Sequence, residues 1–304
     1  MEISSVAPEL RAATLKAPTL NIENRFMLRL VGLASAIIPG KRVDGVDRRV
    51  VRERGLKLRV YIPDKPSGAG LLWIHGGGLV LGAAAMDDVL CGETARQTGV
   101  TVVSVDYRLA PKHPYPAAID DAHAAWLWLQ RHLAELGLDA DRIAIGGQSA
   151  GGGLAASLVQ RVHDEGGTVA AQWLFCPMLD DRTAVDRALD GPDHFVWNNR
   201  SNLVGWSSYL GGAVGTATLP PYAAAARRDD FSGLPPTWMY TSDIELFHDE
   251  DLAYAQRLES AGVDTTLEIV SGAPHGFEAW AADSVLARDI VSRARIWLGA
   301  QLAG

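Results

Sequence analysis

A serine between small residues is the most informative chemical feature of this sequence. The motif Gly-Gln-Ser-Ala-Gly occupies residues 147–151 and is centred on Ser149. The apolar stretch at residues 143–145 precedes it, and residues 154–159 have helical character. Glycines at both ends of the motif tolerate a tight turn, and a sharp strand-to-helix turn exposes a serine hydroxyl for nucleophilic attack. The motif therefore predicts that Ser149 is a nucleophile.

A second glycine motif lies upstream of the serine. The motif His-Gly-Gly-Gly occupies residues 75–78 and follows the apolar stretch at residues 71–74. Backbone N–H groups in such a run can bind an oxyanion that forms during acyl transfer. Together the two motifs predict a nucleophile and a backbone site that stabilises the tetrahedral intermediate.

A nucleophilic serine needs a base and an acid that orients the base. Imidazole is a suitable base because its reference pKa is about 6.5. His275 is the candidate, since it lies between a proline and a glycine in a loop after the last expected strand. Two carboxylates, Asp243 and Glu245, follow the strand expected at residues 236–241. The order serine, acid, histidine is typical of α/β hydrolases, and these residues leave both acids open.

The other histidines fit structural roles better. His75 opens the glycine loop and is interpreted as positioning it. The histidines in expected helices or in the irregular segment are interpreted as packing or surface residues; they are His123, His132, His163 and His194.

Composition limits the class of protein. The chain has 304 residues, of which 48% are hydrophobic, and this suits one large α/β domain with an ample core. The net charge of -8 and the lack of a basic run argue against nucleic-acid binding. Cys91 and Cys176 have no metal or redox spacing, and no histidine pair has zinc-site spacing. We therefore expect a cytoplasmic protein without a metal or cofactor.

The N-terminal region shows no signal peptide and no membrane span. Residues 1–20 carry several charges and lack an apolar core. Residues 26–38 are apolar but too few to span a bilayer, which takes about 20 residues. We expect an amphipathic helix there, which either packs on the core or lines a substrate pocket.

Most of the chain alternates between strand and helix patterns. Residues 1–45 predict helices, and the β-branched runs 47–54 and 56–63, joined at Gly55, predict a hairpin. The alternation that follows predicts a mostly parallel sheet with helices on both faces. The expected strands are 70–75, 100–106, 141–147, 169–176, 236–241 and 264–270, and the expected helices are 86–97, 117–136, 150–163, 249–261 and 281–300.

The alternation breaks between residues 180 and 232. This segment is irregular and aromatic, with Trp197, Trp206 and Tyr209, and it predicts an insertion over the sheet. Chemistry in open α/β sheets gathers at the carboxyl ends of the strands. We therefore expect the two glycine motifs, the candidate acids and His275 to meet at that edge.

Four motifs together give the sequence a resemblance to a known family. They are residues 75–78, Asp-Tyr-Arg-Leu-Ala-Pro at 106–111 with His-Pro-Tyr-Pro-Ala-Ala at 113–118, Gly-Gln-Ser-Ala-Gly-Gly at 147–152, and Pro-His-Gly-Phe at 274–277. Over nearly its whole length the chain resembles the hormone-sensitive-lipase-like branch of α/β-hydrolase esterases, the bacterial family IV carboxylesterases. The stretch from Asp106 to Ala118 is interpreted as a structural brace.

The resemblance implies a fold and an activity. It implies one α/β-hydrolase domain over residues 1–304, with a helical cap from about 1–45 and 181–232. It also implies a catalytic triad and an oxyanion hole made by the N–H groups of Gly77, Gly78 and Ala150. The expected activity is cofactor-free hydrolysis of short- to medium-chain acyl esters, with a small-molecule ester as partner. The oligomeric state stays open, with a homodimer among the expected forms.

The sequence departs from the family pattern at two places. Gln148 stands where relatives commonly have aspartate, next to the nucleophile but outside the triad. The family acid motif Asp-Pro-Leu-x-Asp-Glu matches residues 245–250, so Glu245 falls in the acid position without a gap. Asp243 would need a shift of two residues, and the register therefore favours Glu245.

Two alternatives belong to other functional classes. Relatives of the monoterpene lactone hydrolase type look similar around residues 245–250, which makes lactones a candidate substrate class. A ligand-binding receptor on the same fold is the other alternative. Such receptors have lost a triad member, whereas Ser149, His275 and a carboxylate are all present here. The sequence therefore favours an enzyme.

Overall fold

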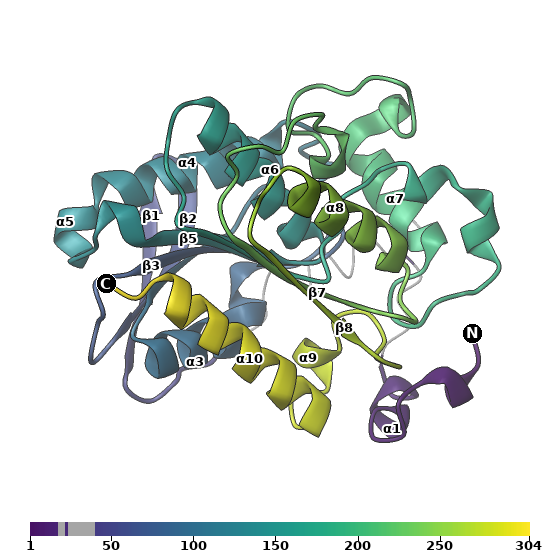
Figure 1. Cartoon of the computed structure of the whole chain (residues 1–304), viewed down its shortest axis with the longest axis horizontal. Helices are drawn as coiled ribbons and strands as arrows, with labels where there is room; N and C mark the ends of the chain where they lie inside the picture. The colour runs from purple at the N-terminus through teal and green to yellow at the C-terminus, as the bar shows by residue number, and fades with distance from the viewer. Residues whose placement is uncertain (18–21, 24–39) are drawn as a thin grey trace.

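A single eight-stranded sheet organises the computed structural model, which describes residues 1–17, 22–23 and 40–304 (Figure 1). The strand order is β1-β2-β4-β3-β5-β6-β7-β8. The strands are β1 (Val46–Glu53), β2 (Leu56–Pro63), β3 (Gly70–Ile74), β4 (Thr101–Val105), β5 (Ile143–Gln148), β6 (Ala171–Phe175), β7 (Thr237–Ser242) and β8 (Thr265–Val270).

The sheet is mostly parallel, as the sequence predicts. β1 and β2 form the expected antiparallel hairpin, and β2 pairs antiparallel with β4. All pairings from β4 through β3, β5, β6 and β7 to β8 are parallel. The carboxyl ends of these strands therefore share one edge, where the loops that follow them meet.

Helices cover both faces of the sheet (Figure 1). One face carries α3, α9 and α10, and the other carries α4, α6 and α8. The helices are α1 (Arg11–Thr14), α3 (Asp88–Thr98), α4 (Ala117–Arg131), α5 (Leu133–Leu136), α6 (Ala150–Asp164), α7 (Asn199–Leu210), α8 (His248–Ser260), α9 (Phe277–Trp280) and α10 (Val285–Gln301).

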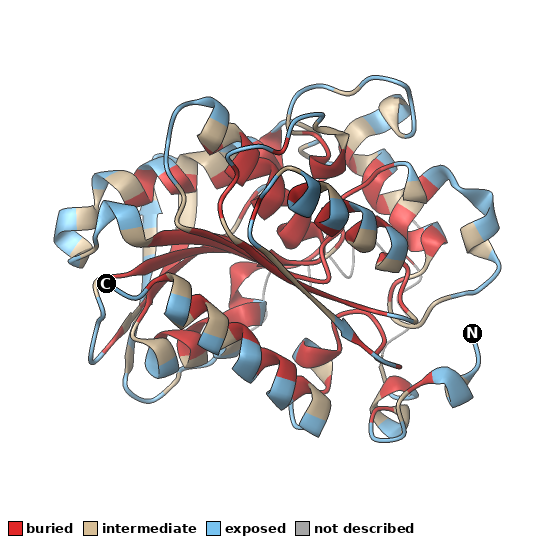
Figure 2. Cartoon of the chain, viewed as in Figure 1, coloured by how far each residue is buried: buried red, intermediate tan, exposed pale blue. Residues whose placement is uncertain are grey.

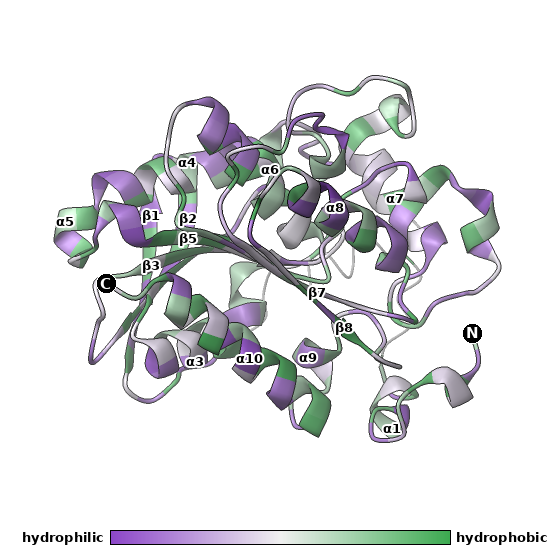
Figure 3. Ribbon diagram, in the orientation of Figure 1, coloured by the Kyte–Doolittle hydropathy of each residue, from purple (hydrophilic) through white to green (hydrophobic). Residues whose placement is uncertain are grey.

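The central strands are buried on both faces (Figure 2). Along β3, Leu71 and Trp73 join the core beneath α10, while Leu72 and Ile74 join the core beneath α6. Successive side chains of a strand point to opposite faces, so a strand covered on both sides must be apolar throughout. α10 instead carries both hydrophobic and hydrophilic positions, as a helix with one solvent-facing side requires (Figure 3).

Two predicted helices differ from the observed ones. The helix expected over residues 117–136 is divided at His132, whose ring stacks on Trp128 and whose Nδ1 lies 2.7 Å from the Trp128 carbonyl oxygen. The helix expected from residue 281 begins at Val285, because the Ser284 hydroxyl accepts a bond from the Ala287 N–H and caps the helix there.

The segment expected to be irregular contains a regular helix. α7 begins after Asn198, whose side chain accepts a hydrogen bond from the Ser201 N–H. At the N-terminus the structure shows a short turn at Ile3–Ser5 and α1. The expected helix at residues 26–38, and with it most of the expected N-terminal part of the cap, lies outside the described residues. Among the residues that are described, no helix is long and apolar enough to cross a membrane.

Candidate active site

Ser149 lies at a sharp turn between β5 and α6. Its backbone has φ +54° and ψ -123°, a conformation that non-glycine residues rarely adopt. Backbone hydrogen bonds hold this turn on both sides: the Ser149 N–H donates to Phe175, and the Ser149 carbonyl accepts from Gly153 and Met178, at 2.8 to 3.0 Å. Contacts with β6, with the loop that follows it and with α6 therefore hold the strained turn, which directs the hydroxyl out of the sheet.

The flanking glycines are required by close backbone contacts. A Cβ atom on Gly147 would lie 2.3 Å from the Gly151 carbonyl oxygen, and one on Gly151 would lie 2.1 Å from the Ile74 carbonyl oxygen. Real Cβ atoms do not approach backbone this closely. The motif predicted from the sequence therefore has a direct steric explanation in the turn.

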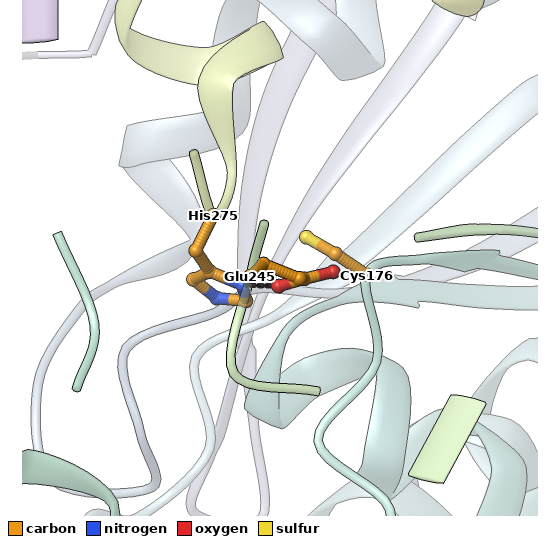
Figure 4. Close-up of side chains that lie close together, drawn as sticks. All are labelled: Cys176, Glu245 and His275. Carbon is orange, nitrogen blue, oxygen red and sulfur yellow. Dashed lines mark hydrogen bonds and ion pairs between the residues drawn. The ribbon is translucent and has the colours of Figure 1, made fainter. Parts of the chain in front are cut away.

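Three residues that are far apart in the sequence form a hydrogen-bonded relay. His275 Nε2 lies 2.8 Å from Ser149 Oγ. On the other side of the ring, His275 Nδ1 lies 2.5 Å from Glu245 Oε2 (Figure 4). The exposed fractions are 7% for Ser149, 7% for His275 and 4% for Glu245. Phe247 packs edge-on against the imidazole, with ring centroids 5.1 Å apart. The geometry is that of a nucleophile, a base and an orienting acid.

The two candidate acids have different partners. Asp243 Oδ1 accepts a hydrogen bond from the Gly272 N–H, and Oδ2 accepts one from the Ser271 hydroxyl, both at 2.7 Å. Its carboxylate therefore braces the loop that precedes His275. Glu245 contacts the imidazole instead, and its second oxygen accepts a bond from Thr241 Oγ1 at 2.8 Å.

Two buried groups beside Glu245 were not identified by sequence reasoning. Asp251 on α8 is fully buried, and burial together with the charge of Glu245 raises its pKa well above the usual range. Its surroundings therefore favour the neutral carboxyl group, which avoids a second negative charge next to Glu245. Cys176 is equally buried, and burial raises the pKa of its thiol. Neither residue belongs to a motif, so no sequence signal marked them.

Cys176, Glu245 and His275 have donor atoms within 4.8 Å of one another (Figure 4). A metal ligand must be deprotonated, whereas the Cys176 thiol is stabilised in its protonated form. The Glu245 and His275 atoms that face each other are already hydrogen-bonded. This arrangement suits proton transfer at Ser149 better than metal binding.

The His-Gly-Gly-Gly loop lies against Ser149. A Cβ on Gly76 would be 3.4 Å from the Ser149 Cβ. Gly77 and Gly78 have φ values of +116° and +60°, which glycine adopts without strain. Within the described part of the chain, the N–H groups of Gly77, Gly78 and Ala150 donate to no protein acceptor. They are free to bind an anionic oxygen beside Ser149.

His75 supports this loop. Its ring stacks on Tyr107 at 4.3 Å, and its Nδ1 lies 2.8 Å from the Gly76 carbonyl oxygen. The Tyr107 hydroxyl donates to the His75 carbonyl at 3.0 Å. Burial lowers the pKa of His75, so the imidazole is neutral and acts as a packing group. These contacts agree with the structural role expected for His75 and for the stretch that begins at Asp106.

A second hydrogen-bond network joins the end of β5 to the segment that follows His275. Gln148 Nε2 donates to Glu278 Oε1 at 2.5 Å, and the Tyr240 hydroxyl donates to Glu278 Oε2. Burial raises the pKa of Glu278. Gln148 precedes Ser149, and Glu278 lies on α9, just after His275. The network thus fixes two parts of the site relative to each other, and Glu278 is a residue that sequence reasoning missed.

The fold and the relay define a class of protein, the α/β-hydrolase enzymes with a serine nucleophile at a strand-to-helix turn. The family model described as alpha/beta hydrolase fold matches residues 71–279, and the chain belongs to this family, in the hormone-sensitive-lipase-like branch that its motifs predict. Several of its relatives are named esterases. Esterase LipI of Mycobacterium tuberculosis is 32% identical over 80% of this chain and 76% of its own length.

Other comparisons agree on the reaction. The ethyl acetate hydrolase of Pseudomonas putida is 35% identical over 73% of this chain and 71% of its own length. The solved structure of a bacterial heroin esterase superposes with a TM-score of 0.88 at 35% identity and covers 99% of both chains. This chain is therefore a carboxylesterase that acts on a small-molecule ester.

Proposed function

We propose that this enzyme hydrolyses short- to medium-chain acyl esters with Ser149, His275 and Glu245 as its catalytic triad. The observation that carries the proposal is the continuous relay from Ser149 Oγ through both ring nitrogens of His275 to Glu245. Each member is buried and held by a partner outside the relay, so little reorganisation is needed before reaction.

The first half-reaction acylates the serine. Ser149 Oγ attacks the ester carbonyl carbon while His275 Nε2 takes the hydroxyl proton. Glu245 fixes the tautomer that keeps a proton on Nδ1 and stabilises the imidazolium that forms. The imidazolium then gives its proton to the leaving alcohol. In the second half-reaction, water attacks the acyl-enzyme and His275 repeats the two proton transfers.

The tetrahedral intermediate carries its negative charge on the former carbonyl oxygen. We assign its stabilisation to the N–H groups of Gly77, Gly78 and Ala150, which have no protein acceptor among the described residues. Ala150 begins α6, so its N–H also lies at the positive end of that helix. Loss of one such donor typically costs about 10²- to 10³-fold in turnover.

We propose that residues 181–232 form a cap that limits the size of the substrate. A Cβ on Gly78 would lie 2.1 Å from Cη2 of Trp197, so this indole packs directly on the oxyanion loop. A Cβ on Gly205 of α7 would lie 2.6 Å from the Gly78 carbonyl oxygen. An apolar wall this close to the reacting carbonyl favours small apolar acyl or alcohol groups. The known activity on ethyl acetate of one relative supports a short-chain preference.

Replacement of the nucleophile tests the proposal. Ser149→Ala should preserve the fold and reduce turnover of p-nitrophenyl acetate by about 10⁶-fold, since loss of a triad nucleophile has that effect in a well-studied case. Ser207→Ala is a matched control, because Ser207 is an exposed serine on α7. A fluorophosphonate should label only Ser149 in a peptide map, and EDTA should leave turnover unchanged. Labelling of another serine, or normal turnover by Ser149→Ala, would reject the mechanism.

The substrate class is tested with a graded panel. We expect p-nitrophenyl acetate and butyrate to be hydrolysed with higher kcat/KM than the octanoate and decanoate, and simple lactones to be poorer substrates than acyclic esters. A maximum at decanoate, or preferential hydrolysis of lactones, would contradict the proposed specificity without affecting the triad assignment.

A further inference from the structure

Helices α3, α9 and α10 cover the face of the sheet opposite α6 (Figure 1). Residues of these three helices line a cavity. Its volume is about 390 Å³, which falls within the range of small-molecule binding sites. Ser149 and His275 do not line it, whereas Gln148 and Glu278 do. The network between Gln148 and Glu278 thus separates this cavity from the catalytic relay.

The wall of the cavity combines apolar surface with an available carboxylate oxygen. Leu90, Ala279 and Val291 supply apolar surface from three helices. Asp87, with an exposed fraction of 7%, also lines the cavity. Its Oδ2 accepts a hydrogen bond from Trp73 Nε1 at 2.7 Å, but within the described residues no donor reaches Oδ1. This oxygen is not enclosed by protein, so it can accept a hydrogen bond from a small molecule in the cavity.

Glu278 adds a second buried carboxyl group, with an exposed fraction of 6%. Both of its oxygens are already occupied, one by Gln148 and the other by Tyr240. Burial is the main cause that raises the pKa of Asp87, and the nearby Glu278 carboxyl group raises it further. A cation bound beside Asp87 would favour the charged form of this carboxyl group, which its surroundings disfavour.

The positive groups of the wall have other partners. Arg295 donates to Thr94 Oγ1 at 3.1 Å, and Glu93 lies close enough to stabilise its charge. Arg288 is exposed and donates to the Asp283 carbonyl oxygen at 2.6 Å. Neither guanidinium is paired with Asp87 or Glu278. Asp87 is thus a carboxyl group beside apolar surface that no guanidinium of the described residues pairs with.

We propose that this cavity binds a small organic ammonium ion, separately from the ester substrate. An N–H of the ammonium group donates to Asp87 Oδ1, and the apolar body packs against Leu90, Ala279 and Val291. A neutral alcohol of the same shape could donate one hydrogen bond but could not offset the charge of the Asp87 carboxylate. A carboxylate of similar size would be repelled by that charge.

Calorimetry on protein whose Ser149 has been blocked with a phosphonate tests this site, because the blocked catalytic site cannot take the probe. Benzylamine should bind with one-to-one stoichiometry. Benzyl alcohol and phenylacetate should bind at least tenfold more weakly. Asp87→Asn should weaken benzylamine binding at least tenfold, because asparagine keeps an acceptor for Trp73 but removes the charge. Asp289→Asn, which removes an exposed carboxylate from α10, should bind benzylamine normally.

Val291→Phe provides a second variant in case Asp87→Asn does not fold. It fills the cavity without changing charge and should abolish benzylamine binding, while circular dichroism reports its fold. The proposal is overturned by any of three results: equal affinity for benzyl alcohol and benzylamine, unchanged binding by Asp87→Asn, or loss of benzylamine binding on blocking Ser149. The last result would place the amine in the catalytic site.

Discussion

Asp87→Asn should change the pH dependence of stability in a calculable way. Burial, augmented by the charges of Glu278 and Asp88, raises the pKa of Asp87 from 3.8 to about 6, and the hydrogen bond from Trp73 offsets only part of that rise. A carboxyl group with a raised pKa binds its proton more tightly in the folded state than in the unfolded state. Its protonation therefore stabilises the fold fully below about pH 4, and this contribution is lost as the pH rises through about 6.

The size of the effect follows from the pKa difference. The folded and unfolded pKa values differ by about two units, and each unit corresponds to about 1.4 kcal/mol, so protonation of Asp87 contributes roughly 3 kcal/mol to the free energy of unfolding at low pH. About 2 kcal/mol of this contribution is lost between pH 4 and pH 8. Asparagine does not titrate, and its side-chain oxygen can still accept the bond from Trp73. The free energy of unfolding of Asp87→Asn, relative to the wild type, should therefore rise by about 2 kcal/mol from pH 4 to pH 8.

The assay is urea unfolding of both proteins at several pH values, followed by tryptophan fluorescence and circular dichroism. Other titrating groups are common to both proteins, so they cancel in the difference. Agreement between the two probes and equal m-values would support two-state analysis. A difference that stays constant within about 0.5 kcal/mol across this range would refute the argument that Asp87 is protonated preferentially in the fold.

Three further predictions concern catalysis. Glu245→Gln should lower kcat on p-nitrophenyl acetate by about 10⁴-fold, as the corresponding acid-to-amide change does in a serine protease triad. Asp243→Asn should lower kcat by about tenfold or less. A larger loss in Asp243→Asn than in Glu245→Gln would reject Glu245 as the triad acid. Gly78→Ala should lower kcat by about 100-fold or more, because the added Cβ collides with Trp197 and moves a donor of the oxyanion hole. Gly212→Ala is the control and should keep normal activity, because a Cβ there has no atom within 4 Å. Equal activities of the two variants would contradict the oxyanion-hole assignment. Trp197→Ala should raise kcat/KM for octanoate relative to acetate by about threefold or more, and an unchanged ratio would show that this indole does not limit substrate size.

Some features of the site could be predicted because they depend on neighbouring residues. The glycines around Ser149 are dictated by a turn whose atoms all lie within a few residues or on the adjacent strand. The alternating strands and helices are encoded in local hydrophobic patterns, and their parallel arrangement follows from the long connections between them. The family register pointed to Glu245, but spacing alone left Asp243 as an alternative two residues away.

Other features could not be predicted because they depend on contacts between distant segments. Asp243 and Glu245 differ in role because the loop at Ser271 and Gly272 satisfies one carboxylate and leaves the other to His275. Glu278 pairs with Gln148 across 130 positions of the chain. Such pairings require the packed sheet to bring the groups together.

The sequence by itself determined the fold class and the serine motif, since periodicity and local sterics encode these, and it gave the chain order of the candidate triad residues. Only the tertiary structure decided which carboxylates are buried, charged or unpaired. Burial and the electrostatic environment of Asp87, Asp251 and Glu278 arise from side chains supplied by several strands and helices at once. No single stretch of sequence contains that information, because desolvation is a property of the whole packed core.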